Sequence, residues 1–311
     1  MNPLRLLPLA LITLTIGAAP APTPQAATPA AAAQRTRPPG YRDPTQGRKK
    51  VLFVADLNTG VPTAHDWSAS RAAAVLEQIG HDTGDFDLYI QTTTDLVTKG
   101  TVYGTGEHAQ GGSFPTHSRN LDYFDAVVFF TNGDTKMTDQ QVKDLLSFVH
   151  DDGKGFVGIH TATVTLTKHP EYGDMIGAFF DNHPWGVTTA PVIVEDPKNP
   201  AMKDFKTGSI ITDEFYQMKA PYDRSKVDVL MRLDTSKLDL HNRNVHRTDG
   251  DFPLAWIKNY GKGHVFYSAL GHPVDAWNDK RIRDMYLQGI RWALGETDMT
   301  VHPHPMRPAA K

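Results

Sequence analysis

Apolar runs and helical repeats alternate along the first half of the chain. The runs are short, as in strands that are buried on both faces of a parallel sheet. Two of the intervening stretches place apolar residues every three or four positions, as in helices. The pattern predicts strands at 51–54, 86–90, 126–130 and 155–159 and helices at 69–79 and 138–149. This order indicates a parallel sheet with helices on its faces.

The second half of the chain has more strands and shorter connections. Its apolar runs predict strands at 192–194, 209–218, 227–233, 254–259 and 264–269. Residues 260–263 carry the glycines of a hairpin turn, and a last helix at 280–294 ends before Gly295, a typical C-cap residue. The polar, glycine-rich stretch 92–120 is expected to form a long loop. We therefore predict one domain over residues 48–296, a three-layer α/β/α fold with a mostly parallel central sheet.

The two ends of the chain differ from this domain. Arg5 precedes an apolar stretch that is too short to span a membrane, which indicates a signal peptide within residues 1–27. Residues 28–47 are rich in alanine and proline and are predicted to be a linker, and residues 297–311 are predicted to be a flexible tail. The sequence thus predicts a secreted or periplasmic protein with no stable membrane span after processing. An uncleaved anchor is the alternative.

Composition excludes several classes of site. The chain has no cysteine, so it has no disulfide, no thiolate metal site and no thiol nucleophile. Its net charge is -3 and its basic residues are scattered, which argues against a nucleic-acid partner.

Polar side chains follow several of the predicted strands. In open parallel sheets, ligands bind at the carboxyl ends of the strands. His65 and Asp66 come after the first strand, Asn132 after the third, His160 after the fourth and His272 after the last. Because these strand ends share one edge of the sheet, we expect the side chains to lie near one another.

His160 directly follows its strand, within the glycine-containing segment 154–162. A tight turn at such a place exposes the side chain above the sheet and leaves backbone N–H groups nearby. We therefore expect His160 to point out of the core, as a general acid, a base or a metal ligand. No Gly-x-Ser-x-Gly motif supplies a serine nucleophile instead.

Two further segments carry candidate chemistry. Asp213 and Glu214 are neighbours on a predicted strand, so their side chains point to opposite faces. Glu214 shares the phase of Tyr216, which favours Glu214 as the acid or ligand, and Asp213 is interpreted as a surface charge or a turn cap. His183 follows a segment that is expected to be a helix ending near 179–180, and it precedes Pro184; it is either a site histidine or a loop residue.

The candidate histidines allow two kinds of site. His160, His183, His272 and Glu214 form a nitrogen and oxygen set that suits zinc or a similar divalent ion, although no HExxH motif joins them. The same histidines could instead bind sugar hydroxyls. His302 and His304 also have the spacing of a metal pair, but they fall in the predicted tail.

Aromatic side chains lie beside these polar residues in the sequence. Trp67, Trp185, Tyr216 and Trp277 could offer the flat surface on which a sugar ring packs. The alternative is that they cover the core. On the first interpretation, His65, Asp66, Asn132, Trp185, Tyr216 and Trp277 bind substrate.

An ordered set of motifs runs through the predicted domain. The motifs are Gly158-Ile159-His160, Tyr172-Gly173, residues 177–180, His183-Pro184, and residues 212–216, 253–256, 266–272 and 289–295. In this order they resemble the ThuA-like (trehalose utilisation) family over roughly residues 50–296. The resemblance implies the class I glutamine amidotransferase-like (flavodoxin-like) fold and work on oxidised (keto) disaccharides.

The sequence departs from the amidotransferases and from this family at three positions. Class I glutamine amidotransferases carry their nucleophilic cysteine where His160 stands, so we do not expect glutamine hydrolysis. Members of the ThuA-like family often have aspartate where this chain has Val164, and histidine where it has Phe252. If those groups are ligands or acids in the family, activity here is altered.

The sequence supports two functions. The first is a secreted hydrolase or lyase that cleaves or rearranges a small 3-keto glycoside, with His160 or Glu214 as the base that removes the acidified proton. His272 and His183 complete the expected catalytic set. The second is a non-catalytic secreted sugar-binding protein, which the departures at Val164 and Phe252 favour.

Overall fold

The computed structural model describes residues 47–56, 65–100, 102 and 120–307. The predicted signal peptide, almost all of the predicted linker, most of the loop expected at 92–120 and residues 308–311 lie outside the described residues. All described residues belong to one compact unit. None of the helices in these ranges is both long and apolar enough to cross a membrane.

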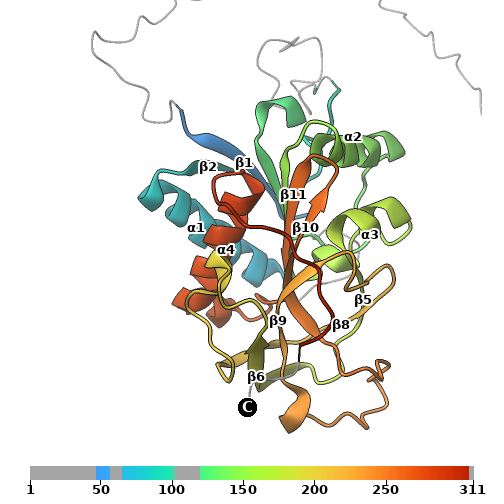
Figure 1. Cartoon of the computed structure of the whole chain (residues 1–311). Helices are drawn as coiled ribbons and strands as arrows, with labels where there is room; N and C mark the ends of the chain where they lie inside the picture. Colours follow the sequence, from blue (N-terminus) through green and yellow to red (C-terminus); the bar gives the residue numbers. More distant parts are fainter. Residues whose placement is uncertain (1–46, 57–64, 101, 103–119, 308–311) are drawn as a thin grey trace, which may run out of the picture. The chain divides into compact units, whose positions relative to one another are not determined.

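A nine-stranded sheet forms the centre of the described region (Figure 1). Its strands stand in the order β2 (Phe86–Gln91), β1 (Lys49–Val54), β3 (Ala126–Phe129), β4 (Gly155–Ile159), β11 (Gly263–Ser268), β10 (Pro253–Tyr260), β9 (Asp228–Leu233), β6 (Val187–Val194) and β7 (Ile210–Glu214). The strands from β2 to β11 are all parallel. The remaining four pair antiparallel and extend the sheet. A separate small sheet pairs β5 (Phe179–Asn182) with β8 (Gln217–Lys219).

Helices cover both faces of the sheet. The helices α1 (Asp66–Thr83) and α4 (Lys280–Ala293) pack on one face, while α2 (Asp139–His150) and α3 (Pro170–Ile176) lie on the other (Figure 1). The predicted three-layer α/β/α class with a mostly parallel central sheet is confirmed. The helix α2 begins with a capping box in which Thr138 and Gln141 exchange hydrogen bonds, so its start is fixed by local chemistry.

The parallel strands match the sequence prediction because they are buried on both faces. Every residue from Val51 to Val54 is fully buried, as are those from Ala126 to Phe129. Apolar runs of this kind are the signature of central parallel strands. Their common direction brings the carboxyl ends of β1, β3, β4 and β11 to one edge, and β7 ends at the same edge.

Two sequence expectations are corrected here. The segment before His183 was expected to be a helix that ends near 179–180, but α3 ends at Ile176 and residues 179–182 form β5. Gly177 ends the helix with a left-handed φ of 102°, and the Trp256 indole donates a hydrogen bond to the Ile176 carbonyl. The stretch predicted as one strand at 209–218 is two strands, β7 and β8, in different sheets.

The segment predicted as a flexible tail is packed through residue 307. Met299 is buried, and the His302 backbone N–H donates to Asp228 on β9. The His304 ring lies 3.6 Å from the Asp228 carboxylate, and Arg232 donates to the Arg307 carbonyl. Buried carboxylates on the sheet thus hold the segment in place, and the His304 ring there faces acidic side chains.

Candidate functional site

Several chain segments meet at the edge where the parallel strands end. His160 follows β4, His272 lies shortly after β11, and Glu214 is the last residue of β7. His65 precedes α1 as its N-cap residue. Each of these four side chains offers a ring nitrogen or a carboxylate oxygen that lies within 4.8 Å of the other three. We call these four residues the histidine cluster.

The backbone turns sharply at His160. Its φ is +46°, a left-handed conformation that is uncommon for a residue with a side chain and that clusters at functional sites. The chain passes directly from β4 into a single 3-10 turn, His160–Val164. The Tyr267 hydroxyl donates a 2.8 Å hydrogen bond to the His160 carbonyl and fixes the turn. The sharp turn predicted at the end of this strand is present.

The side chain of His160 is buried, contrary to the expectation that it points out of the core. Its Nδ1 lies 2.7 Å from the Ala269 carbonyl, which can only accept, so Nδ1 carries the proton. Its Nε2 lies 2.7 Å from the Tyr216 hydroxyl, and the two rings stack. The residues after β11 and β7 therefore cover this imidazole, which is out of reach of a bound substrate.

Glu214 connects the buried cluster to the surface. Its Oε2 lies 3.5 Å from His160 Nε2 and 3.4 Å from His272 Nδ1, while its Oε1 lies 3.7 Å from His183 Nδ1. Burial alone would raise the pKa of Glu214, but the contact with His160 and the neighbouring histidine charges outweigh it and lower the pKa. Glu214 is therefore a carboxylate at neutral pH, and it faces the half-exposed His183 on its outer side.

His65 and His272 offer neutral imidazole nitrogens. Burial, with the charges of His160 and His272, lowers the pKa of His65 to about 4. Burial also lowers the pKa of His272. Both ring nitrogens of His65 are buried without a hydrogen-bond partner among the described residues. Sequence analysis assigned His65 to substrate binding and His183 to the metal set, but in the structure His65 lies inside the cluster and His183 at its rim.

Asp213 is fully buried, so of the two sequence interpretations, a surface charge or a turn cap, the first is wrong. Its carboxylate accepts the backbone N–H groups of Gly271 at 2.8 Å and His272 at 3.0 Å. Burial raises its pKa to about 6, against the opposing effects of His160 and these N–H groups. It thus caps the turn that carries His272, and no sequence pattern could show its burial.

The expected aromatic surface is only partly present. Trp277 is fully buried, donates to the Gly271 carbonyl and stacks on Tyr286, so it supports the turn instead of binding a ligand. Trp185 donates to the Asp239 carbonyl and packs against the buried Phe252. Phe252, one of the positions where the sequence departs from the family pattern, therefore makes an apolar contact. Tyr216 alone of the predicted aromatic residues contacts the cluster within the described part of the chain.

The other predicted residues lie at the same edge. Asp66 is exposed at the start of α1, beside Trp67, whose side chain is 78% exposed. Asn132 is half-buried after β3, and its backbone N–H donates to the Asp56 carbonyl beyond β1. An open aromatic ring thus stands next to His65 in the chain.

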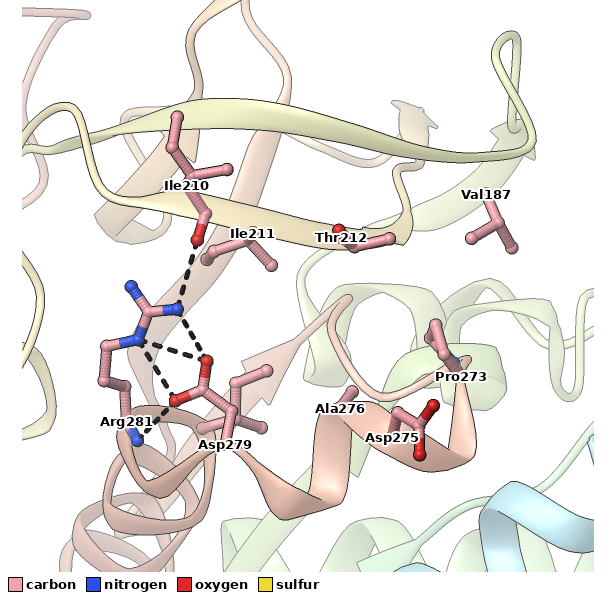
Figure 2. A pocket seen from close by; sticks show the side chains of 10 residues that line it. Val187, Ile210, Ile211, Thr212, Pro273, Asp275, Ala276, Asp279 and Arg281 are labelled. Atoms are coloured by element: carbon pink, nitrogen blue, oxygen red, sulfur yellow. Dashed lines mark hydrogen bonds and ion pairs between the residues drawn. The ribbon is translucent and has the colours of Figure 1, made fainter.

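A cleft of about 440 Å³ lies between β7 and the segment 273–282 (Figure 2). It is lined by Val187, Ile210, Ile211, Thr212, Pro273, Asp275, Ala276, Asp279, Arg281 and Ile282. At one end, Val187 pairs with Glu214 between β6 and β7, and Pro273 follows His272. At the other end, Arg281 pairs with Asp279 and donates to the Ile210 carbonyl (Figure 2). The cleft therefore runs from the cluster along the outer edge of β7.

Comparison with known proteins agrees with this architecture. The sequence profile of the family described as ThuA, trehalose utilisation, matches residues 50–293. A ThuA-like protein of Bacteroides uniformis has a similar structure, with a TM-score of 0.60 and 20% identity, covering 83% of this chain and 95% of that protein. A ThuA-like protein of Parabacteroides merdae has a TM-score of 0.58 and 19% identity, covering 82% and 93%. No curated protein matches the sequence. The match over most of the described domain places this chain in the ThuA family.

Proposed function

We propose that this protein cleaves a 3-keto glycoside by elimination. The observation that carries the proposal is the His183–Glu214 pair, which stands on the open side of a buried histidine cluster and at the end of a cleft. Membership of a trehalose-utilisation family makes a glycoside the natural substrate class. A keto group on that glycoside is what the resemblance to this family implies.

The carboxylates at the site argue against ordinary glycoside hydrolysis. That reaction uses two carboxyl groups, one on each side of the scissile bond. Of the two acidic residues at the end of β7, Asp213 is committed to the backbone N–H groups of the His272 turn. Of these two, only Glu214 faces the open side. A substrate that is already activated by a carbonyl group needs only one base, and an imidazole is strong enough.

The elimination balances without an oxidant or a reductant. The carbonyl at C3 of the sugar acidifies the neighbouring C2–H bond. A base removes that proton, the electron pair forms a C1=C2 double bond, and the C1–O bond breaks. The glycosidic oxygen takes a proton and leaves as the hydroxyl of the released sugar, while the other product is an unsaturated ketone. Water can add to that product in a later step.

His183 is the base in this scheme, in place of His160 or Glu214. Its side chain is 47% exposed, so it can contact a substrate, whereas His160 is covered. Glu214 Oε1 orients the His183 ring and balances the charge that the ring gains on taking a proton.

The cleft holds the leaving sugar. Its volume of about 440 Å³ falls within the usual range for small-ligand sites. Asp275 and Thr212 offer oxygen atoms for sugar hydroxyls, and Val187 and Ile210 offer apolar surface for C–H groups. The cleft begins beside Glu214, so a disaccharide can place one ring at the cluster and the other along β7.

The test is turnover of a 3-keto disaccharide beside its non-oxidised parent. We expect release of free sugar and an ultraviolet-absorbing enone from the keto substrate alone. His183→Ala should lower kcat by roughly 10²- to 10⁴-fold, the usual contribution of a general base. His241→Ala, a change at an exposed histidine outside the cluster, is the matched control. Equal turnover of both sugars, or full activity of His183→Ala, contradicts the proposal.

A sugar-binding role without catalysis is the second candidate. It is favoured by Phe252, which fills an apolar contact where related proteins often have a histidine. Saturable binding of the keto disaccharide with no product over long incubation would support this role.

We also propose that the protein is exported. The support is Arg5 followed by the apolar stretch within residues 1–27. N-terminal sequencing of the mature protein should find a start near residue 27, and a mature chain that begins at Met1 contradicts export.

A further inference from the structure

Three atoms of the histidine cluster are spaced like the ligands of one metal ion. His160 Nε2 lies 3.2 Å from His272 Nδ1. Glu214 Oε2 lies 3.5 Å from the first nitrogen and 3.4 Å from the second. A tetrahedral zinc ion with bonds of about 2.0–2.1 Å separates its ligand atoms by about 3.3 Å. A single ion therefore fits between all three atoms at ordinary bond lengths.

His65 supplies the fourth position. One of its ring nitrogens lies within 4.8 Å of the other three ligand atoms. Both nitrogens are buried and lack a partner among the described residues, an arrangement that is costly in a folded protein. A metal ion gives such a nitrogen the partner it lacks.

The surroundings of His160 and His272 are those of metal ligands. The Ala269 carbonyl accepts the Nδ1 proton of His160 and so turns the Nε2 lone pair toward the cluster. Ligating histidines usually have their second nitrogen fixed in this way. The His272 turn is held by Asp213 on its backbone N–H and by the Ser68 hydroxyl on its carbonyl. In the structure, the Tyr216 hydroxyl lies against His160 Nε2. When a metal ion binds the Nε2 lone pair, this hydroxyl can donate to Glu214 instead.

We infer that His65, His160, His272 and Glu214 bind one divalent metal ion of the zinc type. Three imidazole nitrogens and one carboxylate oxygen suit zinc, cobalt or nickel better than magnesium or calcium, which prefer oxygen ligands. Glu214 binds through Oε2 and leaves Oε1 to His183. If the proposed function also holds, the ion would have to accept the keto oxygen of the sugar as a fifth ligand, and it would then polarise that oxygen.

The experiment measures zinc directly, without substrate. The full chain is made without a histidine tag, stripped with a chelator, and titrated with Zn²⁺ against a chromophoric competitor. We expect one ion per chain, a higher thermal midpoint in the zinc-loaded protein, and visible absorption bands of tetrahedral cobalt after loading with Co²⁺. Zinc affinity should fall at least 100-fold in His65→Ala and His272→Ala, with His302→Ala, in the other histidine pair, unchanged.

Each other outcome overturns the inference. Absence of saturable zinc binding below millimolar concentration shows that the cluster is not a metal site. Wild-type affinity in His65→Ala, or loss of the ion in His302→Ala, places the ion elsewhere. If the alanine variants fail to fold, His65→Gln and His272→Gln are used, with near-ultraviolet circular dichroism to show native packing. Because no sugar is present, failure here leaves the proposed elimination to be judged by its own turnover experiment.

Discussion

The carboxylate of Asp213 on β7 accepts the backbone N–H of His272, at 3.0 Å. The next residue on the same strand, Glu214, lies 3.4 Å from the ring of that histidine. Adjacent strand residues point in opposite directions, so one acid holds the backbone of the turn while the other contacts its side chain. The position of His272 in the cluster is therefore set by two neighbouring residues of one strand.

Replacing Asp213 with asparagine tests this arrangement. The amide keeps one accepting oxygen but turns an NH₂ group toward backbone donors, so the His272 turn should loosen. Zinc affinity is expected to fall about 10- to 100-fold, as for other changes that orient a ligand. The competition titration measures this, with exposed Asp298→Asn as the control. Unchanged zinc affinity would show that the His272 turn keeps its conformation without the Asp213 carboxylate.

Changes at His160 should affect stability more than the sequence implied. An exposed side chain could be removed at a cost below about 1 kcal/mol. In His160→Ala, the Ala269 carbonyl instead loses its buried donor and the Tyr216 hydroxyl loses its contact with Nε2. The loss should be about 2–3 kcal/mol in the free energy of unfolding of the metal-free protein.

His160→Gly is the informative partner of that variant. Glycine adopts the left-handed φ of +46° without strain, whereas alanine pays roughly 1 kcal/mol for it. We therefore expect urea denaturation to find His160→Gly at least as stable as His160→Ala, the reverse of the usual order. A clearly less stable glycine variant would mean that the turn stores no strain.

Sequence reasoning located most of the site because parallel strands end at one edge. His160 and His272 follow strands whose apolar runs are plain in the sequence, so their convergence could be predicted, whereas Glu214 was expected inside a longer strand. The same rule placed His65 at this edge, but its membership of the cluster could not be predicted, because the start of α1 is positioned by packing between distant segments. His183 was predicted to be a ligand because sequence motifs do not show how deeply a side chain is buried.

Burial was the property that the sequence could not supply. Asp213 and Trp277 both sit in polar surroundings in the chain, yet both are fully buried supports of the Gly271 turn. The segment after residue 297 was predicted to be flexible for the same reason. It is rich in proline, and its own sequence does not show that the buried Asp228 on β9 accepts one of its backbone hydrogen bonds. In all three cases, burial depends on contacts with residues that are distant in the sequence.

A buried ion pair outside the site, between Asp251 and Arg224, should make the free energy of unfolding depend on pH in the acid range. Burial alone would raise the pKa of Asp251, but hydrogen bonds and charge from Arg224 lower it. A carboxylate with a lowered folded pKa stabilises the protein above its unfolded pKa of about 3.9, and this contribution is lost as the pH falls further.

Asp251→Asn should therefore be less stable than wild type at pH 7, by about 3 kcal/mol, because Arg224 keeps only one of its two buried acidic partners. The gap should narrow at about pH 3, below the unfolded pKa of about 3.9, because the carboxylate of the unfolded chain is then protonated. Urea midpoints at both pH values measure this, with Asp298→Asn as the control. A gap that stays constant would show that the pair does not titrate in this range.

Filling the cleft should weaken the binding of a disaccharide but not that of a glycoside with a single sugar ring. Ile210 is 53% exposed and lines the end of the cleft away from the cluster. In Ile210→Trp, the larger ring should displace the leaving sugar and raise KM for a 3-keto disaccharide roughly 10-fold, equal to about 1.4 kcal/mol of binding. A methyl 3-keto glycoside has no second ring, so its kcat/KM should change by less than about twofold. Leu240→Trp, at a side chain that is 42% exposed and does not line the cleft, is the matched control. If both substrates are affected equally, the second ring binds elsewhere, and the cleft along β7 has no part in recognising the disaccharide.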